Sequence, residues 1–465
     1  MMLFPELFML MFSVFFLLLS LCEKKASIFP LARLLALIGL VVTFLSAGAS
    51  GEFFSGAYRV DLFSQVFKCL LVTGLCLVVF MLEKNDDIED DFLPEFFMFL
   101  GFSTLGLLML VSSVELISIV ISLEISSFSL YVIVPLRKAH SRLHLEAAVK
   151  YLFFGAIATG IMLYGMGYIY GLAHSTYLSD IMARLPQFLT QPMGILALAL
   201  TLIAFFFKLS LFPLHFWAPD IYEGASNVTT AFIATVPKIA ATALLIRLTM
   251  LASNVPSELA LFLLLLAAFS MTLGNLVGLV QKDIKRLLAY SGIAHAGYLM
   301  MGIIPLSADG GAAAIYYMTV YLFMNLACFY VIILLSRNGS NVSVGDLTGL
   351  AKRSPLLAFT LAVAAFSLAG IPPSGGFTGK LFLFVSAFRA GYLSIVLVGA
   401  VNAVISMFYY LNLVRMSYSR DAEEGQGAIE LVFHQKALCY VFNVLILYLG
   451  LMPFGIMDLF WRAIS

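Results

Sequence analysis

The sequence has few charged residues: Asp, Glu, Lys and Arg make up 11% of its 465 residues, against 62% that are hydrophobic. A soluble domain carries about 25% charged residues, so this composition excludes a surface made for water. The 26 basic residues equal the 26 acidic ones, and a net charge of zero excludes the basic field that binds nucleic acid. The mean hydropathy of +1.03 predicts a membrane protein instead.

The chain also lacks the patterns of metal, redox and nucleotide sites. Its five cysteines are scattered and form no C-x-x-C pair, so neither a zinc site nor an iron–sulfur cluster is indicated. The segment Gly375 to Lys380 fails as a phosphate-binding loop, because Ser374 stands where the pattern needs glycine and Leu381 where it needs Ser or Thr. We therefore expect no cofactor and no metal in this chain.

Long apolar runs fill most of the sequence. A helix needs about 20 apolar residues to cross the core of a bilayer, so these runs predict an all-α polytopic membrane protein with fourteen transmembrane helices. The twelfth run is interrupted by Ile371-Pro372-Pro373. The predicted spans are residues 2–22, 28–48, 63–82, 93–112, 114–135, 145–172, 192–213, 227–249, 257–280, 287–305, 311–336, 355–388, 392–414 and 435–456.

The basic residues between these spans test the count. With the N-terminus placed outside, the inside loops hold 15 basic residues and the outside loops with the C-terminus hold 4. Inside loops carry the excess of Lys and Arg, so the split predicts both termini on the periplasmic side of a bacterial inner membrane. The inside set is Lys24, Lys25, Lys84, Arg137, Lys138, Arg142, Lys282, Lys285, Arg286, Arg337, Lys352, Arg353, Arg415, Arg420 and Lys436; the outside set is Arg59, Arg184, Arg389 and Arg462.

Ionisable residues inside the spans are the functional candidates, because each costs at least a few kcal/mol there. We interpret Arg33, Lys68 and Arg247 as structural, since a long side chain near a span end can reach the interface. Residues deeper in a span cannot reach the interface in this way. Lys208 and Lys380 are each the only Asp, Glu, Lys or Arg in a long apolar stretch. The candidates for proton transfer are Glu124, Lys208, Lys238, His295 and Lys380, with Lys150, Pro213, Pro372 and Pro373 as supporting residues.

The spacing of these residues indicates an internal repeat. The positions of Lys208 and Lys380 differ by 172, and the same offset carries Glu124 to a position next to His295. Spans 4–8 then correspond to spans 9–13, and an odd shift makes the two copies cross the membrane in opposite senses. We expect an N-terminal three-helix segment (1–92), a first five-helix repeat (93–250), a second repeat (257–417) and a C-terminal helix (430–465).

Lysine and histidine in these positions favour proton chemistry. A lysine in an apolar environment loses its proton more readily than one in water, and a nearby carboxylate opposes that loss. A row of such groups titrates as a coupled set. A sodium site would instead favour several carboxylates, carbonyls and hydroxyls.

Several segments follow one another along nearly the whole chain: Glu115-Leu116, Ser122-Leu123-Glu124, Leu145–Tyr151, Phe207–Asp220, Pro237-Lys238-Ile239, Asp283–Ser291, Ile293–Tyr298 and Gly370–Lys380. In this combination and order they resemble the antiporter-like membrane subunits of respiratory complex I, the proton-pumping NADH:quinone oxidoreductase, and most of all its subunit N branch. The departures are Ser122, where glycine is usual, and Gly224 to Val228, where prolines are usual.

This resemblance implies two inverted five-helix repeats with broken helices 7 and 12. It implies a Glu124–Lys208 pair, a central Lys238, a terminal Lys380 and Lys150 on the sixth helix. It also implies partner membrane subunits, including antiporter-like neighbours, and places NAD, FMN, iron–sulfur clusters and quinone in partner subunits.

Two other functions stay open at this point. The chain could belong to a multi-subunit cation/proton antiporter or to a ferredoxin- or hydrogenase-linked relative of complex I, because no residue identifies the electron donor. It could also be a structural spacer whose buried charges only hold helices together.

Overall fold

The computed structural model describes residues 1–21, 28–83, 88–138, 142–251, 257–336, 339–419 and 427–464, and it is almost entirely helical. Cys22 and the loop residues Lys24, Lys25, Lys84, Arg337 and Arg420 lie outside this part. The helices are α1 (Phe4–Ser20), α2 (Ile28–Ser46), α3 (Leu62–Met81), α4 (Leu93–Ser112), α5 (Leu116–Ile133), α6 (Arg142–Ala173), α7 (Leu178–Phe188), α8 (Pro192–Leu209), α9 (Trp217–Gly224), α10 (Asn227–Leu251), α11 (Ser257–Gly278), α12 (Ile284–Ile303), α13 (Ala308–Leu335), α14 (Leu350–Arg353), α15 (Pro355–Ala369), α16 (Gly375–Arg389), α17 (Leu393–Tyr418), α18 (Phe433–Leu451) and α19 (Phe454–Ile464).

Every predicted span coincides with helix, and the predicted all-α membrane class is confirmed. Eleven helices of the described chain are long and apolar enough to cross a membrane, and α1 and α15 are shorter apolar helices. The twelfth predicted span consists of two helices, α15 and α16, separated by the Pro372-Pro373 segment. The number of crossings stays a prediction.

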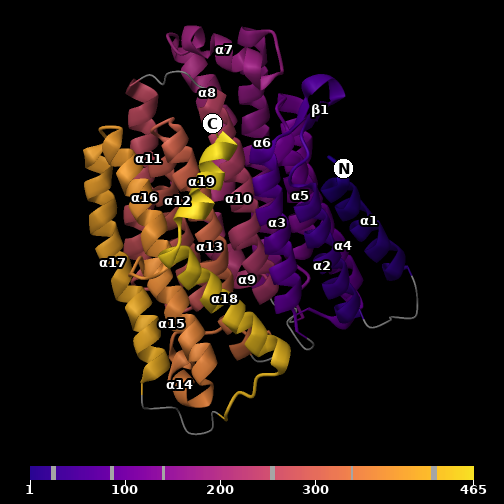
Figure 1. Cartoon of the computed structure of the whole chain (residues 1–465), viewed down its shortest axis with the longest axis vertical. Coiled ribbons are helices and arrows are strands. Elements are labelled where there is room, and N and C mark those ends of the chain that lie inside the picture. Colours follow the sequence, from indigo (N-terminus) through magenta and orange to yellow (C-terminus); the bar gives the residue numbers. More distant parts are fainter. Residues whose placement is uncertain are drawn as a thin grey trace.

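The long helices stand side by side in one bundle (Figure 1). α1 and α17 lie at opposite edges, and α10, α12 and α13 fill the centre, where nearly every side chain is buried. Both termini lie towards the end of the bundle that carries α7. The side of a membrane that this end faces stays a prediction.

Several shorter elements escaped prediction. The strands β1 (Gly51–Phe53) and β2 (Tyr58–Val60) pair as an antiparallel hairpin between α2 and α3. After α18 the chain turns at Pro453 and continues as α19, which packs on α13 and α3. The C-terminal segment therefore ties the second half of the bundle to the N-terminal helices.

Two helix breaks match each other closely. α8 ends at Leu209, with the next residue Ser210 in the left-handed conformation, and α15 ends at Ala369, with Gly370 in the left-handed conformation. In both, the following amide donates back to a phenylalanine carbonyl five positions earlier, from Leu211 to Phe206 and from Ile371 to Phe366. A cis proline bond follows each cap. The positions of the two left-handed caps differ by 160, whereas those of the two lysines differ by 172.

The starts of α5 and α12 also match. Each begins with an acidic cap, Glu115 or Asp283, whose carboxylate accepts a hydrogen bond from the backbone three positions on. Each cap also forms a β-bridge to the connection that follows the next long helix. The positions of the two caps differ by 168, and this offset aligns Glu124 with Gly292. The single offset of 172 was therefore wrong, although paired local features exist.

Candidate functional site

Glu124 and Lys208 come together from α5 and α8. The hydroxyl of Thr159 on α6 donates to Glu124 Oε1 at 2.7 Å. Lys208 is buried, and its Nζ lies 5.6 Å from the centre of the Tyr151 ring without a hydrogen-bond partner among the described residues. The two side chains interact electrostatically. Glu124 and Lys208 thus interact without a direct ion-pair contact in the described part of the chain.

Lys238 lies at the centre of the bundle on α10. It is 2% exposed, and its Nζ also has no hydrogen-bond partner in the described part of the chain. A cavity of about 10 Å³ lies between it and His295, and Leu209, the neighbour of Lys208, lines the same cavity. That space is close to the smallest that holds one water molecule. Lys238 and His295 thus line one small space in the centre of the bundle.

His295 on α12 is the best-connected residue of the site. Its Nδ1 lies 2.5 Å from the hydroxyl of Tyr317, and its Nε2 lies 3.1 Å from the hydroxyl of Tyr410. It interacts electrostatically with Lys238 on one side and with Lys380 on the other. The imidazole is thus placed to exchange protons in two directions, since each ring nitrogen can donate or accept.

Lys380 closes the site at the break between α15 and α16. Its Nζ donates to the carbonyls of Leu368 at 2.8 Å and Ala369 at 2.9 Å, which are among the last carbonyls of α15 and have no helical donor. The same ammonium lies 4.8 Å from the centre of the Tyr298 ring. Lys380 belongs to the helix after the break, whereas its charge sits at the end of the helix before it.

We call the five predicted residues the charged row: Glu124, Lys208, Lys238, His295 and Lys380. Glu124 interacts electrostatically with Lys208, and His295 interacts with both Lys238 and Lys380. Lys208 and Lys238 are buried amines that form no hydrogen bond to any described residue. Nearly all buried polar groups in proteins are hydrogen-bonded, so such exceptions point to function. The arrangement can hold protons at separate positions and pass them through hydroxyls and water.

Lys150 lies apart from the charged row. It is about a third exposed and pairs with Glu146 at 2.6 Å and Asp220 at 2.7 Å. Arg286 pairs with Asp220 and with Glu223. Burial alone would raise the pKa of Asp220, but hydrogen bonds from Lys150 and Arg286 hold that pKa below its usual value. The supporting prolines, Pro213, Pro372 and Pro373, lie in the two breaks.

Two of the three basic residues expected to reach the interface are buried instead. Lys68 and Arg247 do not reach an interface: Lys68 is fully buried and pairs with Glu6, and Arg247 is 4% exposed and pairs with Asp61. Their acidic partners lie far away in the sequence, so no local pattern could reveal the pairs. Arg33 is half-buried and donates to the carbonyl of Leu82 at 2.8 Å, close to a span end as expected.

Sequence reasoning also missed the neutral residues that connect the charged row. They are a threonine and four tyrosines on apolar helices, where such side chains usually only pack. The one available signal is that tyrosines recur near His295 on α12 and α13. These residues are Thr159, Tyr151, Tyr298, Tyr317 and Tyr410. In the described part of the chain, no group of three or more His, Cys, Asp or Glu could hold a metal ion.

Comparison with known proteins places this geometry in a family. Residues 113–406 match the NADH:quinone oxidoreductase/Mrp antiporter transmembrane family. The chain is 44% identical to NADH-quinone oxidoreductase subunit N 2 of Opitutus terrae, over 92% of this chain and 89% of that relative. It is 43% identical to the subunit N 2 of Solidesulfovibrio magneticus, over 99% and 97%.

Solved structures agree. A chain of respiratory complex I from Thermus thermophilus, with bound aureothin, superposes with a TM-score of 0.84 at 32% identity, over 98% of both chains. A chain of the Mrp complex from Dietzia sp. superposes with a TM-score of 0.85 at 19% identity, over 99% and 97%, and shows the same fold. The chain is an integral membrane protein and belongs to the NADH:quinone oxidoreductase/Mrp antiporter transmembrane family.

Proposed function

We propose that the chain is the subunit N type of membrane subunit in a proton-pumping NADH:quinone oxidoreductase, and that it moves protons through the charged row. The names of its relatives and the 32% identical complex I chain support the assembly. The observation that carries proton movement is the pair of buried lysines, Lys208 and Lys238, which lack a hydrogen-bond partner among the described residues. Leu209, the neighbour of Lys208, lines the same small cavity as Lys238.

The geometry suggests how the row works. When Glu124 is charged, it favours the protonated form of Lys208; when that charge moves or is neutralised, Lys208 releases its proton more readily. The proton passes to Lys238, then through the cavity to His295, and from there to Lys380. Neighbouring positive charges repel, so filling one position favours emptying the next. Redox chemistry in other subunits would drive the cycle.

The same proposal includes the surroundings of the chain. The matching caps and breaks support two inverted repeats, spans 4–8 and 9–13, between a three-helix N-terminal segment and a C-terminal helix. Both termini face the periplasm of a bacterial inner membrane. NAD, FMN, iron–sulfur clusters and quinone bind to partner subunits, and antiporter-like subunits are neighbours in the membrane.

Glu124→Ala and Lys208→Ala test the proposal in the assembled complex. Each removes one side of the first pair, so proton pumping falls while quinone reduction and assembly persist. Proton uptake and NADH oxidation are measured together in membrane vesicles. Lys138→Ala is the control, because this exposed lysine lies beyond the end of α5. Wild-type pumping in both variants would rule out the charged row, and loss of assembly without loss of pumping per complex would favour a structural spacer.

A further inference from the structure

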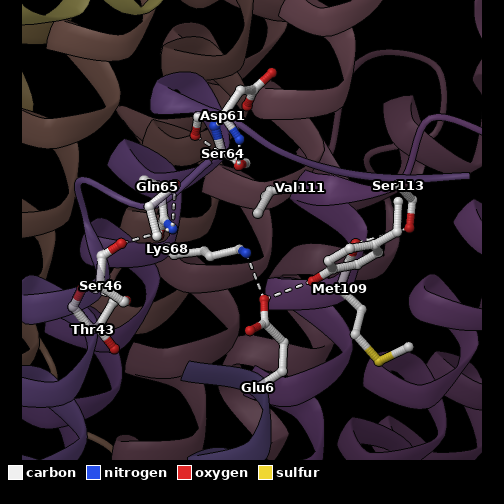
Figure 2. A network of polar contacts seen from close by, with 12 residues as sticks. Glu6, Thr43, Ser46, Asp61, Ser64, Gln65, Lys68, Met109, Val111 and Ser113 are labelled. Carbon is white, nitrogen blue, oxygen red and sulfur yellow. Dashed lines mark hydrogen bonds and ion pairs between the residues drawn. The ribbon is translucent and has the colours of Figure 1, made fainter. Parts of the chain in front are cut away.

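A second group of buried charges lies between the N-terminal helices and α10 and includes no residue of the charged row; Figure 2 shows Glu6, Lys68 and Asp61 of this group. Glu6 comes from α1, Tyr58 from β2, Lys68 from α3, and Arg247 from α10, where it pairs with Asp61 at the start of α3. Glu6, Lys68 and Arg247 are all less than 9% exposed. The proposed proton route does not use them.

The two carboxylate oxygens of Glu6 differ in their partners. Its Oε1 accepts from the Tyr58 hydroxyl at 2.6 Å and lies 2.6 Å from Lys68 Nζ. Its Oε2 is buried and has no hydrogen-bond partner within the described ranges. One carboxylate oxygen therefore holds both donors, and the other has free lone pairs. A protonated carboxyl can carry its proton on such a free oxygen.

A polar face of α3 runs from Lys68 to the N-terminal end of the helix. Asp61, Ser64, Gln65 and Lys68 follow at helical spacing, so they share one face. Ser64 and Asp61 form a reciprocal cap, and Gln65 donates to the carbonyl of Ser46 at 3.0 Å. Oε1 of Gln65 has no partner among the residues that the structure describes. Figure 2 shows these side chains between Lys68 and the helix start.

Beyond that face lies a polar cavity of about 610 Å³. Asp61 and Arg247 line it together with Glu52, Arg59, Tyr177 and Ser307. The Asp61 side chain is 31% exposed, but that of Arg247 is 5% exposed and also lies over the ring of Phe63. Burial acts to raise the pKa of Asp61, but hydrogen bonds from Arg247 hold it below its usual value. This ion pair separates the cavity from Glu6 and Lys68.

We propose that Glu6 and Lys68 form a second proton-binding site, which exchanges protons with the cavity past the Asp61–Arg247 pair. The site rests on the proposed function in one respect: its protons are those that the complex moves. A proton from the cavity binds Glu6 Oε2, which neutralises the carboxylate and frees Lys68 from its ion pair. The Lys68 ammonium then keeps its contact with the face of the Tyr58 ring, 5.4 Å from the ring centre.

The groups around the site fit this role. The titratable and charged neighbours are Tyr58 from the hairpin, Asp61 and Cys69 from α3 and its start, and Arg247 from α10, and α4 contributes the hydroxyl of Ser112. Burial, and then Glu6, raises the pKa of Tyr58, so its hydroxyl stays a donor to Glu6. Two carboxylates face two cations, so one added proton leaves a single positive charge that favours release.

The experiment uses the assembled complex in membrane vesicles and compares Glu6→Gln with Glu6→Asp. Glutamine keeps an oxygen for both donors but cannot bind a proton, whereas aspartate keeps a titratable carboxyl. Glu52→Gln is the matched control, because Glu52 lines the same cavity but is exposed and pairs with Arg59. The proposal predicts fewer protons pumped per NADH in Glu6→Gln, recovery in Glu6→Asp, and no change in Glu52→Gln.

Two outcomes would overturn the inference. Proton pumping at the wild-type level in Glu6→Gln would exclude proton binding at Glu6. Failure of both Glu6 variants to assemble would show that the Glu6–Lys68 ion pair only stabilises the structure. Glu124→Ala in parallel separates the two proposals. Reduced pumping in Glu124→Ala with full pumping in Glu6→Gln rejects only the second site, whereas full pumping in Glu124→Ala rejects the charged row.

Discussion

Gly292 shows how little space separates members of the charged row. A Cβ at this position would lie 3.1 Å from Lys238 Nζ and 3.1 Å from the Tyr321 hydroxyl, at the edge of the 10 Å³ cavity. Because Gly292 aligns with Glu124 in the first half, the second half has open space where the first has a carboxylate. The absence of a side chain at Gly292 therefore leaves room beside the Lys238 amine, in the small cavity that His295 also lines.

Gly292→Ala fills part of that space. The Lys238 head group is flexible and can shift, so we expect the protein to fold and the complex to assemble, but proton pumping falls because a water no longer fits. Pumping per NADH oxidised in vesicles is the measurement. Gly160→Ala serves as the control, because a Cβ added there would meet no atom of the described chain within 4 Å. Equal pumping by the two variants would contradict a role for the cavity.

Tyr317 tests the hydroxyls around His295. Tyr317→Phe removes the partner of Nδ1 and leaves the ring packing intact. Loss of a neutral hydrogen bond amounts to about 1 kcal/mol, or about fivefold in the rate of a step that uses it. Tyr222→Phe is the control, since that buried hydroxyl has no partner in the part of the chain that the structure describes. The pumping rate of Tyr317→Phe should be lower than that of Tyr222→Phe, and the reverse order would contradict the assignment.

At this scale the sequence identified the charged residues but not their connections. Glu124, Lys208, Lys238, His295 and Lys380 stand out because a charge in an apolar span is rare. Thr159 and the tyrosines do not, because the same residue types also pack in ordinary cores. Lys68 was misjudged for another reason: its partner Glu6 belongs to a distant segment of the sequence, and only the packing of α1 on the neighbouring helices brings the two together.

At the scale of the helix, the two breaks explain why proline follows the first lysine but precedes the second. Lys208 lies on α8, just before its break, and Lys380 lies on α16, just after the matching one. The Lys380 side chain reaches back to Leu368 and Ala369, which align with Lys208 and Leu209 when the two left-handed caps are superposed in sequence. Both ammonium groups thus lie close to the end of a broken helix.

The difference between the lysines predicts different effects on stability. Lys380→Met leaves the two α15 carbonyls without a donor, which costs about 1–3 kcal/mol, whereas Lys208→Met removes a charge that has no hydrogen bond to the described residues. We expect a lower thermal unfolding temperature for Lys380→Met than for Lys208→Met in purified protein, with pumping impaired in both. Equal unfolding temperatures would show that the carbonyl contacts contribute nothing.

Helix positions followed well from hydrophobicity, while irregular elements did not. Each of the fourteen apolar runs contains helix, because a backbone in lipid must satisfy its own hydrogen bonds. The β1–β2 hairpin, α7, α9 and α19 lie in polar or short segments, where apolar run length carries no information. The spacing of the two lysines did not give the spacing of the paired features for a different reason. Lys208 lies before its helix break and Lys380 lies after the matching break, so the two spacings differ.

At the scale of the whole molecule, the most buried helices carry the centre of the charged row, and the outer helices expose apolar side chains. α10, α12 and α13 hold Lys238, His295 and Tyr317, and these helices lie between the edges formed by α1 and α17 (Figure 1). The hairpin, α19 and the N-terminal helices meet at the end where both termini lie. Composition predicted the membrane class, but only the packed bundle shows which of these buried residues lie near one another, such as Glu124 with Lys208 and Lys238 with His295.

Lys238→Met is the sharpest test of proton movement along the charged row, because this lysine is the central member of the row. Its amine makes no hydrogen bond within the described chain, so its loss leaves no partner unsatisfied. The measurement is the number of protons translocated per NADH oxidised by the assembled complex in sealed vesicles. The account predicts a ratio below that of the wild type with the subunits present in normal amounts. A wild-type ratio in Lys238→Met would contradict it.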